Sequence, residues 1–81
     1  MAKPSPNYGG SPELIALGKV VRKLRLNKGF SQESLANEMG LDRSYMGGIE
    51  RGEHNPTLFN LIKISRTLGI KVSDLLNQAK L

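Results

Sequence analysis

The polar side chains that could do chemistry in this sequence are suited to hydrogen bonding, and few of them could make or break covalent bonds. The chain has one histidine, His54, and no cysteine. A lone histidine without cysteine or a paired acid at ligand spacing makes neither a metal site nor a nucleophile–base pair, and a role as a loop residue fits it better. The chain also lacks a glycine-rich loop that would cradle a phosphate. The sequence therefore indicates no enzyme activity, no metal and no cofactor.

Apolar and small residues recur at regular places between Gln32 and Gly52, with polar residues between them. Numbered from Gln32, places 4, 8, 10, 15 and 18 are apolar and hold Leu35, Met39, Leu41, Met46 and Ile49. Ala36 and Gly40 supply the small residue and the turn glycine that two helices need when they cross at about 90 to 120°. The remaining places form the outward face of the second helix, and they are Asp42, Arg43, Ser44, Gly47, Gly48 and Arg51. The pattern predicts two crossed helices, the second with a polar face that Gly47 and Gly48 leave bare.

Capping residues indicate the elements that must position this surface. Suitable N-caps for five helices are Ser11, Ser31, Asp42, Thr57 and Ser73. Glycines that can end a helix follow the first four, at Gly29, Gly40, Gly52 and Gly69. In the first helix one face is apolar, through Leu14, Leu17, Val21 and Leu24. Ile70 and Val72 alternate in the connector before the last helix, and no hairpin signal appears, so we expect an all-α domain.

Length and charge place the chain in a broad class. Its 81 residues make one domain near the lower size limit for an unstapled core, so we expect tight helix packing or dimerisation. A net charge of +5 favours a nucleic-acid or anionic partner, although Ser31 to Glu53 holds two arginines against five acidic residues. Residues 1–11 are rich in proline and glycine, so we expect a flexible arm before a domain at 12–81. With no long apolar run and no signal-peptide pattern, we expect a soluble, cytoplasmic protein.

Residues 17–76 resemble the helix-turn-helix domain of the phage-repressor (Cro/C1, or XRE) family. The stretches that carry the resemblance are SQESLANEMGL, IERG, NPT and LGIKVSDLL. The portion LDRSYMGGIERGEHNPTL is also similar to the controller proteins of restriction-modification systems. The resemblance implies a compact five-helix Cro/C1-type domain that regulates transcription and binds pseudo-palindromic double-stranded DNA operators as a homodimer. It places a recognition helix at about 43–51 in the major groove, makes RNA polymerase a further candidate partner, and implies no membrane partner.

Base contacts implied by the resemblance come from the recognition helix and are assigned to Arg43, Ser44, Tyr45 and Gly47. The fork of N–H donors on Arg43 matches the O6 and N7 acceptors of guanine. Family proteins often have a polar residue where Gly47 stands, so fewer base contacts are expected there. Backbone contacts are assigned to the start of the motif and to the loop after the recognition helix, at Gln32, Arg51, His54, Asn55 and Thr57.

The resemblance also implies a structural ion pair between Arg25 and Glu50, which would join the first and third helices. Of the acidic residues near the proposed DNA edge, Glu53 has no expected partner. Dimerisation is expected from leftover apolar residues on the fourth and fifth helices, at Phe59, Ile62, Leu76 and Leu81.

Two alternatives remain open at this point. A protein-binding adaptor or antitoxin-like protein could use the same fold and apolar residues to hold a different partner. The pair Gly47 and Gly48 could admit DNA closely or merely weaken the helix, and the cost of two helical glycines favours close approach. RNA is a less expected partner, because two tyrosines and two phenylalanines form no stacking platform.

Overall fold

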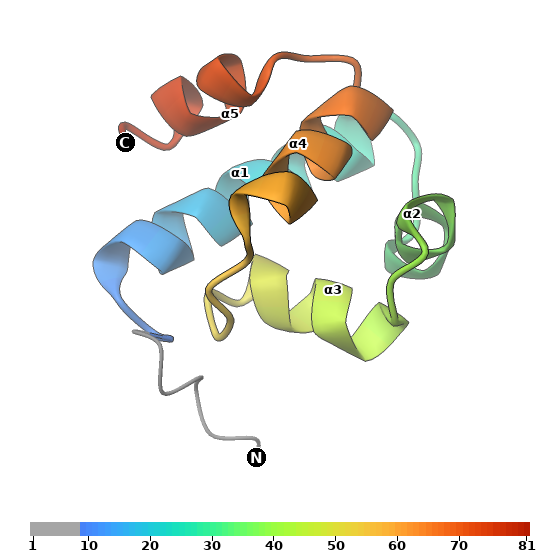
Figure 1. Ribbon diagram of the computed structural model, residues 1–81, viewed down its shortest axis with the longest axis horizontal. Helices are drawn as coiled ribbons and strands as arrows, with labels where there is room; N and C mark the ends of the chain where they lie inside the picture. The colour runs from blue at the N-terminus through green and yellow to red at the C-terminus, as the bar shows by residue number, and fades with distance from the viewer. Residues whose placement is uncertain (1–8) are drawn as a thin grey trace.

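The structure is a computed structural model that describes residues 9–81, which form five helices and no strand. In chain order the helices are α1 (Pro12–Asn27), α2 (Gln32–Met39), α3 (Arg43–Glu50), α4 (Leu58–Thr67) and α5 (Val72–Gln78). They pack around one core, with α3 and α5 on opposite sides (Figure 1). The prediction of an all-α, five-helix domain is confirmed.

Side-chain caps define most of the helix starts. The hydroxyls of Ser11, Ser31 and Thr57 each accept a hydrogen bond from the backbone N–H three residues later, at 3.3, 2.9 and 3.1 Å. Ser34 completes a capping box, because its hydroxyl accepts from the N–H of Ser31 at 2.9 Å. At its other end α2 stops at Gly40, whose φ of +66° is the left-handed conformation typical of a C-cap. These three N-caps and this terminator are where the sequence predicts them.

The last helix begins earlier than predicted. It starts at Val72 with Lys71 in the N-cap position, so the assignment of Ser73 as its N-cap is wrong. Lys71 provides no side-chain cap. Val72 and Leu75 pack against the core, and this burial of an apolar face decides where the helix starts.

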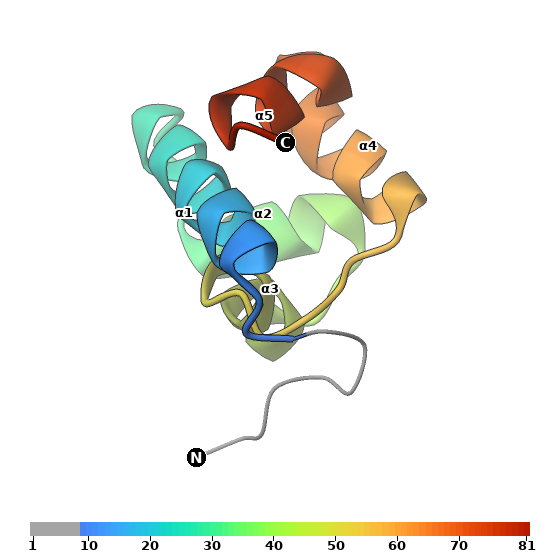
Figure 2. The same cartoon turned by 90° about the vertical axis from the view of Figure 1, so that its left-hand side faces the viewer.

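The apolar faces of all five helices meet in one core. Its buried members are Leu17, Val21, Leu35, Ala36, Met39, Met46, Ile49, Leu61, Ile64, Leu68 and Leu75. The first helix contacts α3 and α5, and α2 contacts α3 and α4. Figure 2 shows α5 lying over α1 and α4, on the side of the core away from α3. This arrangement leaves α3 at an edge of the molecule.

The crossing of α1 and α3 depends on Gly18, which the sequence pattern did not single out. A Cβ on Gly18 would collide with the carbonyl oxygens of Ile49 and Glu50. A second close approach follows α3 at Gly52, where a Cβ would lie 2.7 Å from the Cα of Ile15. Because backbone atoms form these contacts, neither position has room for a side chain, and α1 therefore fixes the end of α3 tightly.

The described chain starts beside the end of α3. The N–H of Gly10 donates to the carbonyl of Gly52 at 2.6 Å, which ties the segment before α1 to the loop after α3. Residues 1–8, most of the predicted flexible arm, lie outside the described residues. Within residues 9–81 no helix combines the length and apolarity needed to cross a membrane.

Candidate nucleic-acid interface

The first turn of α3 presents two polar side chains to solvent. Arg43 and Ser44 are both exposed, and α3 lies along an edge of the molecule (Figure 1). Asp42 occupies the N-cap position of α3 but makes no capping hydrogen bond. Its carboxylate accepts from the hydroxyl of Ser44 at 2.5 Å instead. The guanidinium of Arg43 is thus on the surface, while the hydroxyl of Ser44 has a local acceptor that it can exchange.

The next part of α3 is covered by the loop that follows the helix. The ring of His54 stacks on the ring of Tyr45, with centroids 4.8 Å apart and planes inclined by 22°. The same imidazole lies over Gly48, where a Cβ would overlap its Cδ2 and Nε2 atoms. Gly47 and Gly48 are both buried. The prediction that the glycines leave the helix face bare is therefore wrong, because side chains of the same chain fill the space beside them.

Gly47 lies beneath two longer side chains. A Cβ at this position would come within 3.0 Å of Arg51 Nη1 and 3.5 Å of Gln32 Oε1. The absence of a side chain at Gly47 therefore lets the guanidinium of Arg51 fold back over α3. Gln32 is half-buried and Arg51 is exposed, so both side chains reach the surface beside the helix.

Arg51 is also paired with Glu53. Its Nε and Nη2 atoms donate to the two carboxylate oxygens at 2.8 and 3.1 Å. The hydrogen bond from Arg51 holds the pKa of Glu53 below its ordinary value, and the same bond raises the pKa of Arg51. The acidic residue without an expected partner is thus bound to a residue expected to contact DNA. Two opposite charges flanking a glycine turn were the available sequence signal for this pair.

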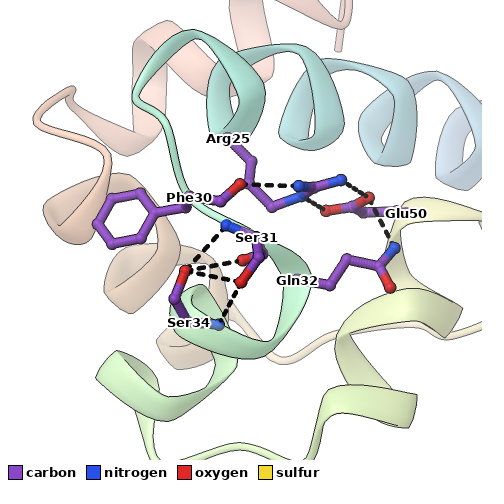
Figure 3. A network of polar contacts seen from close by, with 6 residues as sticks. All are labelled: Arg25, Phe30, Ser31, Gln32, Ser34 and Glu50. Carbon is purple, nitrogen blue, oxygen red and sulfur yellow. Dashed lines mark hydrogen bonds and ion pairs between the residues drawn. The ribbon is translucent and has the colours of Figure 1, made fainter.

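Behind α3, one carboxylate joins three helices (Figure 3). Arg25 on α1 donates to Glu50 from Nε at 2.6 Å and from Nη2 at 3.1 Å, which forms the expected ion pair. Gln32 on α2 donates its amide to Glu50 Oε1 at 3.0 Å. The third nitrogen of the guanidinium, Nη1, donates to the carbonyl of Phe30 at 2.8 Å. Because the side chains of Arg25 and Glu50 are 8% and 3% exposed, they position helices and do not themselves reach a ligand.

The loop between α3 and α4 carries the other expected backbone contacts. Asn55 and Thr57 are exposed, whereas His54 is half-buried and packs from this loop against α3. The hydroxyl oxygen of Thr57 accepts from the backbone N–H of Asn60 to cap α4, which leaves the hydroxyl proton free to donate. Pro56 is buried between them and has a fixed φ, so it limits the freedom of the loop.

Comparison with known proteins assigns this arrangement to a family. The helix-turn-helix family HTH_3 matches residues 21–75, which include all of α2, α3 and α4. The chain belongs to this helix-turn-helix family. Control protein C.BamHI of Bacillus amyloliquefaciens is 47% identical over 64 residues, which cover 78% of this chain and 79% of that protein. This relative supports the resemblance to controller proteins that the sequence suggested.

Solved structures agree with the helix-turn-helix assignment. The restriction-modification controller protein C.AhdI from Aeromonas hydrophila matches with a TM-score of 0.78 at 46% identity, covering 80% of this chain and 98% of that one. The regulator of biofilm formation SinR, solved in complex with DNA, matches with a TM-score of 0.70 at 36% identity, covering 74% of this chain and 97% of that one. The family and the fold class expected from the sequence are confirmed. Membership of this family also agrees with the prediction that the chain is not an enzyme.

This helix-turn-helix domain carries its expected dimer residues on α4, on α5 and beyond α5. Phe59 and Leu81 are 60% and 52% exposed, whereas Ile62 and Leu76 are half-buried. The ammonium of Lys63 lies 5.1 Å from the centre of the Phe59 ring. Leu58, which the sequence pattern did not assign to a surface, is 63% exposed beside Phe59. Leu58, at the start of α4, thus extends the candidate interface beyond the expected set.

Proposed function

We propose that the chain is a sequence-specific DNA-binding transcriptional regulator whose α3 enters the major groove. The observation that carries the proposal is the exposed pair Arg43 and Ser44 at the start of α3, a helix whose other end is fixed by Glu50. A helix fits the major groove, and the base edges there present readable donors and acceptors. Relatives named as control proteins, and a relative solved with DNA, support the proposal.

Base recognition is assigned to the first turns of α3. The planar guanidinium of Arg43 can donate two hydrogen bonds to the O6 and N7 atoms of one guanine. Ser44 would exchange its bond to the neighbouring carboxylate for a base or a phosphate. Tyr45 would contact a base with its ring edge or its hydroxyl. Since Gly47 is buried, contacts at its place would be made through the side chains that lie over it.

Contacts to the DNA backbone are assigned to residues on either side of α3. One N–H of the Gln32 amide donates to Glu50, and its second N–H remains for a phosphate at the N-terminus of α2. The other expected backbone contacts lie at the end of α3 and in the loop after it, at Arg51, His54, Asn55 and Thr57. Phosphate contacts of this kind set register and affinity but carry little sequence information.

The negative charge of the motif does not oppose this proposal. The carboxylate of Glu50 is buried against Arg25, and the carboxylate of Glu53 is paired with Arg51. Four basic residues on α1 and at its C-terminal end are exposed and add long-range attraction to phosphate, and they are Lys19, Arg22, Lys23 and Lys28. Bulk charge on the motif is therefore a poor guide to its partner.

We also propose that the chain binds operators as a homodimer through α4 and α5. The exposed apolar surface of Phe59 and Leu81, with the partly exposed Ile62 and Leu76, supports this interface. A domain of this size gains stability when such surface is buried against a second copy. Sedimentation equilibrium at roughly tens of micromolar should show a dimer, and Phe59→Ser should shift it to monomer. A monomeric wild-type protein at that concentration would rule out the homodimer.

A finer proposal is that the chain is a restriction-modification controller that acts on RNA polymerase at its own promoter. Relatives named as control proteins, among them C.BamHI and C.MunI, support this finer proposal. Methyltransferase and endonuclease genes beside this gene, together with a change in transcription when purified protein is added to polymerase and promoter, would support the proposal. A promoter whose output ignores the protein would contradict it.

Gel-shift measurements across a range of salt concentrations separate the DNA-binding function from the adaptor alternative. A regulator should bind a preferred inverted repeat tightly, with log K falling steeply and linearly against log salt. Its affinity for that site should exceed its affinity for unrelated DNA by about a thousandfold or more. Weak and equal binding to every duplex would instead favour the adaptor or antitoxin-like function.

A further inference from the structure

Tyr45, Gly48 and His54 form a cluster that the proposed base contacts do not explain. Tyr45 and Gly48 are three residues apart on α3 and therefore lie on the same side of the helix. His54 reaches back to both from the loop after the helix, stacking on one and covering the other. The imidazole of His54 thus stacks on the ring of Tyr45 and fills the space that the absence of a side chain at Gly48 leaves.

Glycine is needed at position 48 for the space that it leaves beside the helix, and not for a backbone conformation that other residues avoid. Its φ is not among the positive values found at other glycines of the described chain. Glycine within a helix costs stability relative to alanine, so a second reason is required. The overlap of a Cβ with the imidazole of His54 supplies that reason. The atoms that a Cβ would displace belong to the far end of a flexible side chain, so alanine at this position would move His54 and leave α3 folded.

We infer that His54 is a positioning residue that holds the ring of Tyr45 in the orientation needed to contact a base. Gly48 leaves the space that the imidazole of His54 needs. This inference rests on the proposed DNA-binding function. An unstacked tyrosine side chain exchanges between rotamers, whereas a ring stacked at 4.8 Å against a second ring is restricted to few of them. The ring of Tyr45 is thus already oriented for its base contact in the DNA-free protein. Base preference at one position is therefore set by a loop residue as well as by the recognition helix.

The test compares the DNA sequences that wild-type protein and its variants select from a random duplex pool. Tyr45→Ala first identifies the base positions that depend on Tyr45. His54→Ala should reduce preference at those same positions by about two- to tenfold, the range expected for loss of an aromatic pair. His54→Phe, which keeps a ring at this place, should restore the preference even where overall affinity falls. Gly48→Ala should reproduce the effect of His54→Ala, and combining His54→Ala with Tyr45→Ala should add nothing to Tyr45→Ala alone.

Two further measurements distinguish a packing defect from positioning. The ring-proton shifts of Tyr45 in the free protein should move toward random-coil values in His54→Ala and Gly48→Ala, and circular dichroism should show helix content unchanged. In the His54→Ala background, Gly48→Ala should raise the Tm, because no imidazole then occupies the space beside position 48 and alanine favours the helix.

Unchanged base preference in His54→Ala, or failure of His54→Phe to restore it, would overturn the inference while leaving the proposed function intact. Failure of the wild-type protein to enrich any sequence would overturn the proposed function itself and the inference with it.

Discussion

The guanidinium of Arg25 donates to both carboxylate oxygens of Glu50, at 2.6 and 3.1 Å, with both side chains buried. This pair links α1 to the end of α3. Gln32 adds a third hydrogen bond to the same carboxylate from the first helix of the motif. One buried carboxylate, which accepts three hydrogen bonds, therefore joins α1, α2 and α3.

Arg25→Met should lower the free energy of unfolding by about 3 to 5 kcal/mol, because it leaves the buried carboxylate of Glu50 without its counter-charge. Urea denaturation followed by circular dichroism measures the loss. Arg22→Met is the matched control on the exposed face of the same helix, and it should change stability by less than about 0.5 kcal/mol. Equal effects of the two variants would show that the buried pair does not hold the helices together.

Gly18→Ala should destabilise the domain by about 1 to 3 kcal/mol or more, because the added methyl group must separate α1 from the backbone of α3. Thermal and urea denaturation measure this effect. Lys19→Ala, next along the same helix but exposed, should be nearly neutral. Alanine is ordinarily the better helix former, so a stabilised Gly18→Ala variant would contradict the close crossing of the helices.

Glu53→Gln should increase DNA affinity and make its salt dependence steeper by about one unit of slope, because Arg51 is released to contact phosphate. Since the pKa of Glu53 is held below its ordinary value, the wild-type carboxylate stays charged through the neutral range and releases Arg51 only as the pH falls through that lowered pKa. The gain in DNA affinity from Glu53→Gln should therefore be constant near neutral pH. In an Arg51→Ala background the steeper slope should disappear, and its persistence there would exclude the release of Arg51 as the cause.

Gln32→Ala should weaken binding to all DNA sequences by a similar factor, because the amide is assigned to a phosphate and not to a base. Filter binding with the preferred duplex and with a scrambled duplex measures both affinities. The variant also removes one of the hydrogen bonds to Glu50, so its free energy of unfolding should fall by about 1 kcal/mol. A loss of affinity confined to the preferred duplex would assign Gln32 to base recognition instead.

Local sequence rules predicted the parts of the fold that local chemistry controls. Hydroxyl caps at Ser11, Ser31 and Thr57, and the terminator at Gly40, fixed the helix boundaries, since each acts within about one turn of its own helix. The start of α5 was misplaced because burial of Val72 outweighed the capping preference of Ser73.

Contacts between elements were harder to predict. The glycines of α3 suggested a bare surface, but the conformation of the following loop brings His54 over Gly48. Gln32 bonds to Glu50 across 18 positions in the chain, and no periodicity shows where those two side chains meet. Gly18 gave a weak signal as a glycine inside a helix, yet only the packed structure shows which backbone it accommodates. Packing between a helix and the loop or helix beside it, not local propensity, decided each of these cases.

Selection of bound duplexes from a random pool, with wild-type protein and Arg43→Ala side by side, tests the central proposal most directly. Wild-type protein should enrich an inverted repeat. Arg43→Ala should bind that repeat more weakly by about 1 to 3 kcal/mol and should lose preference at one base position in each half-site. If both proteins select the same sequence with the same affinity, α3 is not the recognition helix and the proposed mode of DNA binding is wrong.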